Sequence, residues 1–275
     1  MINSFFVYPY LMESEKEVVR MNLKTDPEII RGQAEWAGVR PGMRIADIGC
    51  GPGITTSVLG QMARAGGEAV GVDFSRERIE WANMYYADPT TRFLRRDIQE
   101  PLDDLGSFDF IWVRFLLEYF RSRSFDIVKK LAGLLNPGGI LCLIDLDLNC
   151  LNHYGLPQNL ENSLKGLMKK LEETKDFDPY AGRRLYSFLY DLNFDRIDVD
   201  LSAHHLIFGK LHEKDEFNWI TKAMVAARNS GYNFYNEFSN GFAGFYEAFI
   251  KFFLDPRRFT YTPVIACAGR RPPDL

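Results

Sequence analysis

The stretch that most constrains the fold is residues 45–53, IADIGCGPG. A short apolar segment leads into a turn that contains Gly49, Gly51 and Gly53, and apolar residues then recur at helical spacing. Glycine allows a sharp turn and lets a ligand approach the backbone where a Cβ would block it. The N-terminus of the following helix offers unpaired N–H groups. The pattern therefore predicts a strand, a ligand-binding turn and a helix, although a purely structural turn would use the same glycines.

The residues around this turn narrow the ligand. A dinucleotide-binding loop would carry a third glycine for close helix–strand packing where this chain has Ile54. Downstream, the apolar segment VGVDFS (70–75) contains the acid Asp73. An acid at the end of the second strand of a βαβ unit can accept hydrogen bonds from ribose hydroxyls. The two observations favour a ligand with an adenosine ribose and without a pyrophosphate.

Strand-like and helical segments alternate through the first half of the chain. Strands are expected near residues 43–48, 70–73, 91–98, 108–113 and 140–147, and later near 194–208 and 259–270. This rhythm predicts an α/β fold, a doubly wound, mostly parallel, seven-stranded Rossmann-like sheet with helical cap insertions. We expect a single domain over residues 1–275, with an N-terminal helical segment (1–40) and two inserts (150–180 and 210–256) that form a substrate cap.

Several helix boundaries can be predicted from local signals. Residues 10–37 are expected to be helical in two pieces, because Asp26 precedes Pro27 as an N-cap precedes proline at the first helical position. Ser75 is a candidate N-cap for the helix after the second strand. The pattern from Phe115 to Leu135 predicts one long helix after the fourth strand.

Composition excludes several classes of function. The 275 residues carry a net charge of -4 and a pI near 5.7, which argues against nucleic acid as a partner. The sequence has no secretory signal pattern and no apolar run of the roughly 20 residues that would span a membrane. Its four cysteines have no metal-ligand spacing, so we expect reduced buried thiols, no metal and a cytoplasmic protein. The oligomeric state stays open.

Five segments in order resemble the successive motifs of the class I S-adenosylmethionine-dependent methyltransferases. They are IADIGCGPG, VGVDFS, FLRRDIQEPL, FDFIWVRFLLEYF and LLNPGGILCLID, and the likeness covers about residues 10–147 and the last strand. They resemble in particular the small-molecule branch that includes quinone-biosynthesis C-methyltransferases. The resemblance implies S-adenosylmethionine as cofactor, S-adenosylhomocysteine as product and a small-molecule methyl acceptor as partner.

The resemblance also implies a role for individual residues. The methionine part of the cofactor would contact Asp47, Gly49 and Gly51, beside Cys50 and with Gly53 starting the helix. Asp73, next to Phe74, would bind the ribose, and Asp97, next to Ile98, would bind the adenine amino group. Arg114 would lie near the sulfonium, and Tyr10 and Arg20 of the N-terminal segment would close over the cofactor. Where relatives often have histidine this chain has Tyr119, so a role attached to that histidine does not transfer.

Each of these acids and bases also has a structural explanation. Asp47 can satisfy backbone donors in the turn, and Asp97 can end its strand as a turn residue. Arg114 can form an ion pair with Glu118 one helical turn along. These alternatives remain open at the level of sequence.

The chemistry of methyl transfer from a sulfonium requires mainly that nucleophile, methyl group and sulfur be held in line. Phe115, Tyr119 and Tyr10 are candidates for cation–π contact with the sulfonium. A hydroxyl or carbon acceptor also needs a general base. Candidates for that base are His153, His204, His205 and Glu118, but none lies in a motif, so no catalytic residue is assigned.

Three rival functions are weighed against methyl transfer. A nicotinamide-dependent oxidoreductase would share the fold, but the third glycine is missing. A nucleic-acid amino-methyltransferase would be expected to carry D/N-P-P-Y/F after the fourth strand, where this chain has Trp112-Val113-Arg114-Phe115. A non-catalytic cofactor-binding protein remains an alternative.

The segment 242–253 carries an aromatic stripe. Six aromatic residues recur at three- and four-residue spacing, which predicts a helix with a wide apolar face. Such a face can simply pack on a core. Because the ligand crevice of a doubly wound sheet lies at the carboxyl ends of its strands, it could also roof that crevice for a hydrophobic or aromatic acceptor.

Overall fold

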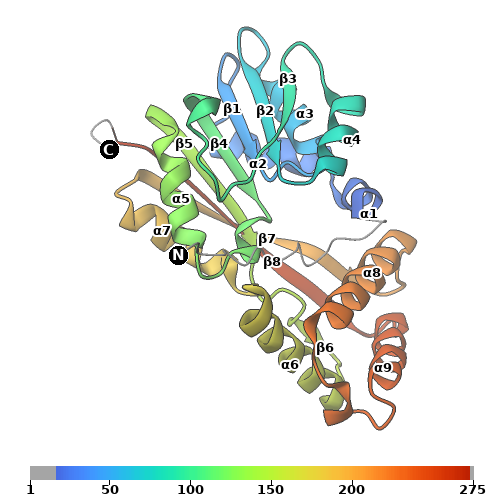
Figure 1. Cartoon of the computed structure of the whole chain (residues 1–275). Helices are drawn as coiled ribbons and strands as arrows, with labels where there is room; N and C mark the ends of the chain where they lie inside the picture. The colour runs from blue at the N-terminus through green and yellow to red at the C-terminus, as the bar shows by residue number, and fades with distance from the viewer. Residues whose placement is uncertain (1–16, 273–275) are drawn as a thin grey trace, which may run out of the picture.

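The computed structural model describes residues 17–272, which are organised around one sheet (Figure 1). Its strands are β1 Arg44–Ile48, β2 Glu68–Asp73, β3 Thr91–Arg95, β4 Phe108–Arg114, β5 Leu135–Leu146, β6 His153–Tyr154, β7 Asp195–Phe208 and β8 Phe259–Arg270. The order is β3-β2-β1-β4-β5-β8, with β7 on the free edge of β8 and β6 beside its first residues. Strands β1 to β5 pair in parallel, and β8 is antiparallel to its neighbours. The predicted doubly wound, mostly parallel sheet is confirmed, with the two-residue β6 added to the expected strands.

Helices cover both faces of this sheet. They are α1 Glu17–Lys24, α2 Pro27–Ala37, α3 Ile54–Ala63, α4 Arg76–Tyr86, α5 Ser124–Gly133, α6 Gln158–Lys175, α7 Leu185–Asp191, α8 Glu213–Ser230 and α9 Phe242–Leu254, with short 3-10 turns η1 Asp103–Leu105, η2 Leu117–Tyr119, η3 Ala181–Arg184 and η4 Phe234–Asn236. On one face Leu59 of α3 packs with the buried Trp112 of β4. On the other, Leu131 of α5 and Leu189 of α7 pack against Leu143 of β5. Burial on both faces explains why β4 and β5 are almost continuously apolar.

The predicted helix caps are confirmed. Asp26 accepts a hydrogen bond from the Glu28 N–H at 2.9 Å, and Pro27 is the first residue of α2. Ser75 accepts one from the Arg78 N–H at 3.4 Å and caps α4. The caps fix where α2 and α4 begin.

The predicted single helix over residues 115–135 is wrong. The chain forms η2, turns again, and begins α5 only at Ser124. Backbone donors in this segment are satisfied by distant side chains: the Glu118 N–H donates to Asp145 at 3.1 Å, and the Ser122 N–H donates to Asp176 at 2.9 Å. Because these tertiary bonds replace helical ones, periodicity alone predicted too long a helix.

The helices α6, α8 and α9 form a second core around the extended ends of β7 and β8 (Figure 1). Its buried members include Leu164 of α6, Trp219 of α8, and Phe245 and Phe249 of α9. We call these three helices the helical lobe. The four cysteines are buried free thiols, as expected. No helix within residues 17–272 is long and apolar enough to cross a bilayer.

Candidate functional site

The turn after β1 has the conformation that its glycines allow. Gly49, Gly51 and Gly53 have φ values of 80°, 55° and 101°, which other residues rarely adopt. The Gly49 and Cys50 N–H groups donate to the Val72 carbonyl at 2.8 and 3.0 Å, so the turn is held against β2. A Cβ on Gly53 would lie 2.8 Å from the Cβ of Ala82, so α3 and α4 could not pack as closely around any other residue.

Asp73 ends β2 beside this turn, and its carboxylate is held by three donors. Its Oδ2 accepts from the Gly51 N–H at 3.0 Å. Its Oδ1 accepts from the Ser75 N–H at 2.9 Å and from Arg78 Nε at 3.1 Å. The ion pair with Arg78 is almost fully buried. Asp73 therefore joins the glycine turn, the end of β2 and the start of α4, in a fixed orientation.

Asp47 is buried in β1 and accepts a hydrogen bond from Thr56 Oγ1 of α3 at 2.6 Å. Burial raises the pKa of this carboxyl to about 7, while the Thr56 hydroxyl and the Arg114 guanidinium act in the opposite direction. The sequence alternative, contacts with backbone donors of the turn, is not what the structure has, because the partner is a side chain. A cation placed beside this carboxyl would lower its pKa and favour the ionised form.

The remaining residues expected near the adenine lie after β2 and β3. Asp97 follows β3 and accepts from the Gln99 N–H at 2.9 Å, so it also serves as a turn residue. Ile98 is buried, whereas the Phe74 side chain is 53% exposed beside the Arg95 guanidinium, 5.6 Å from its ring centroid. Together with Asp73, these residues surround one edge of the sheet at the carboxyl ends of β2 and β3.

Helix α1 lies across the glycine turn. The Sδ of Met21 is 3.3 Å from where a Cβ on Gly51 would be. The buried Arg20 forms an ion pair with Glu17 at 2.6 Å and donates to Asn218 of α8 at 3.0 Å. Arg20 therefore links α1 to the helical lobe, and its expected role of closing over the cofactor stays a prediction. Tyr10 lies outside the described residues.

Arg114 and Phe115 mark the end of β4. The Arg114 guanidinium stacks 4.0 Å from the Phe115 ring centroid, and burial lowers its pKa to about 10. Within residues 17–272 it makes no ion pair with Glu118, and its buried Nε has no hydrogen bond. Phe115 has a φ of 56°, a strained value for an aromatic residue. Strain of this kind is concentrated at functional sites.

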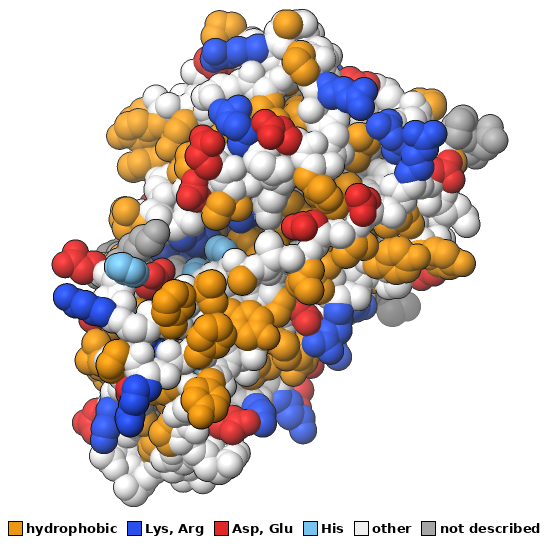
Figure 2. Space-filling view, turned by 180° about the vertical axis from the view of Figure 1, so that it is seen from behind, with side chains coloured by type: hydrophobic (Ala, Val, Ile, Leu, Met, Phe, Trp, Pro, Cys, Tyr) orange, Lys and Arg blue, Asp and Glu red, His pale blue; other side chains and the backbone are white. Residues whose placement is uncertain are grey.

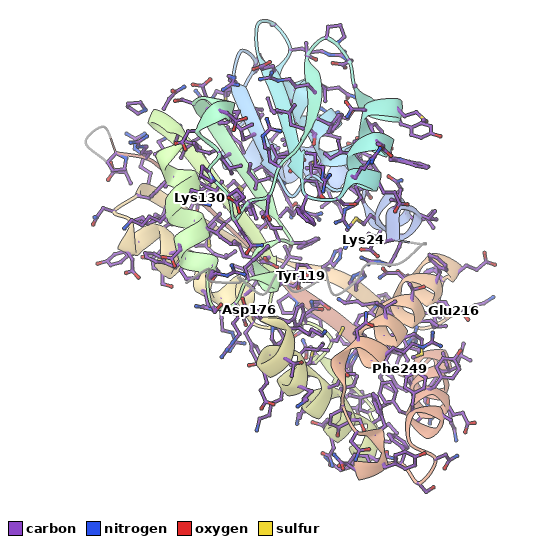
Figure 3. The ribbon with its side chains drawn as sticks, viewed as in Figure 1. Lys24, Tyr119, Lys130, Asp176, Glu216 and Phe249 are labelled. Atoms are coloured by element: carbon purple, nitrogen blue, oxygen red, sulfur yellow. The ribbon has the colours of Figure 1, made fainter. Side chains whose placement is uncertain are left out.

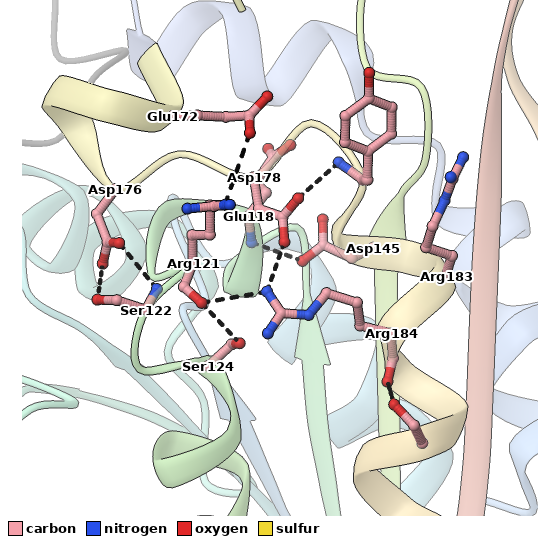
Figure 4. A network of polar contacts seen from close by, with 12 residues as sticks. Glu118, Arg121, Ser122, Ser124, Asp145, Glu172, Asp176, Asp178, Arg183 and Arg184 are labelled. Carbon is pink, nitrogen blue, oxygen red and sulfur yellow. Dashed lines mark hydrogen bonds and ion pairs between the residues drawn. The ribbon is translucent and has the colours of Figure 1, made fainter. Parts of the chain in front are cut away.

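A buried polar network joins η2 and β5 to the helical lobe. Lys222 of α8 donates to Asn149 Oδ1 at 2.5 Å, and Asn149 donates to Glu118 at 2.6 Å. Burial raises the pKa of the Glu118 and Asp145 carboxyls. Figure 4 shows how the network continues from Glu118 towards Asp178 and the Arg184 guanidinium. It fixes η2, and with it the residues that follow β4.

The three candidate histidines have different environments. His153 is held at both ring nitrogens, by Thr260 Oγ1 at 2.8 Å and the Cys150 carbonyl at 3.2 Å, and burial lowers its pKa to about 4. The His204 and His205 rings are adjacent, with centroids 3.8 Å apart. The space-filling view shows histidine and Lys or Arg side chains set back in a hollow between the sheet and the helical lobe (Figure 2).

Several residues of this region were missed by sequence reasoning. Thr56, Asn149 and Lys222 carry no local motif and become neighbours of the site only through the fold. One signal was available for Lys24, which lies four residues after Arg20 and so shares its face of α1.

Comparisons with known proteins indicate a family for part of the chain. Residues 46–143 match the model of a family described as a methyltransferase domain. These residues, about a third of the chain, are similar to methyltransferase domains. The match confirms the predicted likeness to the class I methyltransferases and S-adenosylmethionine as the cofactor of the domain. Residues 3–87 also match a model for protein-L-isoaspartate(D-aspartate) O-methyltransferase.

The curated relatives cover only part of the chain. The methyltransferase region is 34% identical over 127 residues to the ubiquinone biosynthesis O-methyltransferase of Mesorhizobium japonicum, spanning 45% of this chain and 49% of that one. It is 32% identical to the demethylmenaquinone methyltransferase of Staphylococcus aureus, spanning 38% and 44%. The chain thus spans about half the length of these relatives.

Solved structures share the fold over most of the chain. The phosphoethanolamine N-methyltransferase 2 of Haemonchus contortus, in complex with S-adenosyl-L-methionine, has a TM-score of 0.57 at 15% identity and covers 94% of this chain and 57% of its own. The [4+2]-cyclase SpnF has a TM-score of 0.53 at 16% identity and covers 90% and 81%. A neighbour named as a cyclase illustrates that the fold does not determine the reaction.

Proposed function

We propose that this protein transfers a methyl group from S-adenosylmethionine to a small hydrophobic or aromatic molecule. The observation that carries the proposal is the carboxylate of Asp73, fixed at the end of β2 beside a glycine turn. An ionised carboxylate has about four lone-pair sites. Three donors use three of them, so one site remains for a ribose hydroxyl.

The other cofactor contacts follow from the same placement. Asp47, Gly49, Cys50 and Gly51 would border the methionine part, where a backbone without Cβ atoms permits close approach. Asp97, beside Ile98 and with Phe74 nearby, would accept from the adenine amino group. Gly53 would begin the helix beneath, and Arg114, Arg20 and Tyr10 would border the sulfonium and methionine side. When bound, S-adenosylmethionine supplies an electrophilic methyl group on a good leaving group.

The protein's contribution is to hold the acceptor in line and exclude water. We call the region where α1, the end of β4 and α8 meet the junction. We assign the acceptor side to the helical lobe, with α8 rather than α9 closest to the cofactor, because α8 supplies Lys222 and Asn218 to the junction. Phe245 and Phe249 of α9 are fully buried and belong to the same hydrophobic core as Trp219 of α8. Figure 3 places Phe249 among these helices and Lys24 at the junction above them.

The composition supports a small-molecule partner and no nucleic acid, because the net charge is negative. The four buried thiols support a cytoplasmic location.

The test is binding followed by turnover. S-adenosylhomocysteine should raise the melting temperature of the protein, because it binds only the folded state, and NAD should not. Label from methyl-labelled S-adenosylmethionine should then pass to extractable aromatic acceptors. A shift with NAD instead would favour the oxidoreductase alternative, and binding without transfer to any acceptor would favour a non-catalytic cofactor-binding protein.

A further inference from the structure

Three side chains at the junction converge on one aromatic ring. The Lys24 Nζ of α1 lies 5.2 Å from the Phe115 ring centroid, Arg114 lies 4.0 Å from it, and the His204 ring of β7 lies 5.2 Å away. They come from three elements far apart in the chain, and Phe115 directly follows β4. They therefore meet at the carboxyl end of that strand, where a doubly wound sheet binds its ligands.

These side chains lack the partners that buried polar groups normally have. Arg114 Nε and His204 Nε2 are buried without a hydrogen bond to any residue that the structure describes, as is Nδ2 of Asn218 on α8. No hydrogen bond or ion pair of Lys24 is found among the described residues; its Nζ contacts the Phe115 ring and acts on Glu17 and Glu118 only through longer-range charge interactions. A buried polar atom without a hydrogen bond destabilises the folded state. Several at one place indicate that a polar ligand completes the site.

A β-bulge places His204 there. The register between β7 and β8 shifts between His204 and Ile207, and His205 has a φ of 53°. Consecutive side chains of a regular strand point to opposite faces, but a bulge can bring both to one side. The adjacent rings are the result: His204 contacts Phe115, and His205 lies 5.5 Å from Trp219 of α8. The bulge thus brings the His204 and His205 side chains of the edge strand β7 to one side of the strand, towards the site.

We propose that His204 accepts the proton of a hydroxyl on the acceptor, and that Lys24, with Arg114, stabilises the resulting oxyanion. The inference rests on the proposed methyl transfer and makes it an O-methylation of an acidic hydroxyl, such as a phenol. The hydroxyl proton passes to the free imidazole nitrogen, and an oxygen lone pair forms the new O–C bond. The C–S bond breaks with its electron pair going to sulfur, and the imidazolium then releases its proton to water.

The charges around His204 suit this role. The groups that face it are His205 on its own strand, Lys24 of α1, Arg114 of β4 and Lys222 of α8. Burial, and then these neighbours, hold the pKa of His204 well below its usual value, so the ring is neutral and can accept a proton. The same cations lower the pKa of an acceptor hydroxyl. A weak base such as His204 can then accept its proton.

The probe for the test is 4-nitrophenol, because its phenolate absorbs visible light and methylation removes that absorption. In the complex with S-adenosylhomocysteine, the bound probe should ionise at least about one pH unit lower than the free probe, a tenfold change in its ionisation constant. Lys24→Met should abolish this shift and Lys24→Arg should retain it. Lys165→Met, at a lysine exposed on α6, should behave as wild type.

With S-adenosylmethionine, His204→Gln should lower kcat for methylation of 4-nitrophenol by about 10²–10⁴-fold below the pH at which the bound probe ionises, and by less above it. His212→Gln, at an exposed histidine before α8, is the matched control. Absence of probe binding, an unshifted ionisation or an unchanged pH profile in His204→Gln would overturn the proposal. S-adenosylhomocysteine binding, measured alongside, reports separately on the proposed function.

Discussion

The glycine turn and the junction with the helical lobe satisfy their polar groups in different ways. At the turn, the Asp73 carboxylate has three donors and Asp47 has the Thr56 hydroxyl. At the junction, Arg114 and His204 have buried nitrogens without a hydrogen bond to any described residue, and Lys24 contacts the Phe115 ring. The first region is preorganised by its own backbone and side chains, whereas the second is polar, largely buried and incomplete.

The difference matches the demands of two ligands. A cofactor of constant shape can be bound by a rigid turn whose donors and acceptors are already oriented. An acceptor has to bring its own polar group to a site that has unused hydrogen-bonding capacity. We therefore propose that the incomplete region selects the methyl acceptor, and that the complete region binds the cofactor.

The largest expected effect is on the stability of the helical lobe. Phe249→Ala should lower the free energy of unfolding by about 3–5 kcal/mol, because the ring is fully buried. Urea denaturation measures this loss, and Tyr246→Ala, at a side chain 38% exposed on the same helix, should cost less than about 1 kcal/mol. A small loss for Phe249→Ala would mean that the ring lines a ligand site, as the aromatic stripe first suggested.

A second prediction concerns the pH dependence that Asp47 confers. Because its folded pKa is raised to about 7, the folded state holds a proton that the unfolded state has lost above about pH 4. The free energy of unfolding should therefore fall between about pH 4 and 7, by roughly 2–4 kcal/mol from this group.

Asp47→Asn should remove that decline, as measured by urea denaturation at several pH values. Asp191→Asn, at the exposed end of α7, is the matched control and should keep the wild-type profile. Parallel curves for Asp47→Asn and wild type would show that Asp47 is ionised in the folded protein throughout this range.

The third prediction weakens the preorganised region itself. Asp73→Ala should reduce the affinity for S-adenosylhomocysteine by about 1.5–3 kcal/mol, roughly ten- to 150-fold, through loss of a charge-assisted acceptor. Asp88→Ala removes an acid that also accepts backbone hydrogen bonds but lies in a turn before β3, and it should bind normally. Equal affinities in a calorimetric titration of the two variants would rule out Asp73 as the ribose ligand.

The sequence predicted the two regions unequally for a physical reason. The caps Asp26 and Ser75 act through neighbours within a few residues, and the glycine turn and Asp73 belong to one βαβ unit, so their spacing carries the information. The junction depends on long-range contacts. Lys222 reaches Asn149 across 73 residues, and no local pattern records that pairing.

The errors have the same origin. The predicted helix over 115–135 ignored Asp145 and Asp176, whose carboxylates accept from backbone N–H groups that a helix would otherwise use. The aromatic stripe of α9 was correctly predicted as helical, but its depth in the lobe depends on α6 and α8. His204 had no motif, because its position follows from a bulge in β7 that the sequence does not mark.

The central claim is that the preorganised end of β1 and β2 binds S-adenosylmethionine. The most direct test is a calorimetric titration of the wild-type protein with S-adenosylmethionine, S-adenosylhomocysteine and NAD. The account predicts saturable binding of the first two at one site per chain, and no heat with NAD. Binding of NAD, or no binding of either S-adenosyl compound to the folded protein, would contradict it.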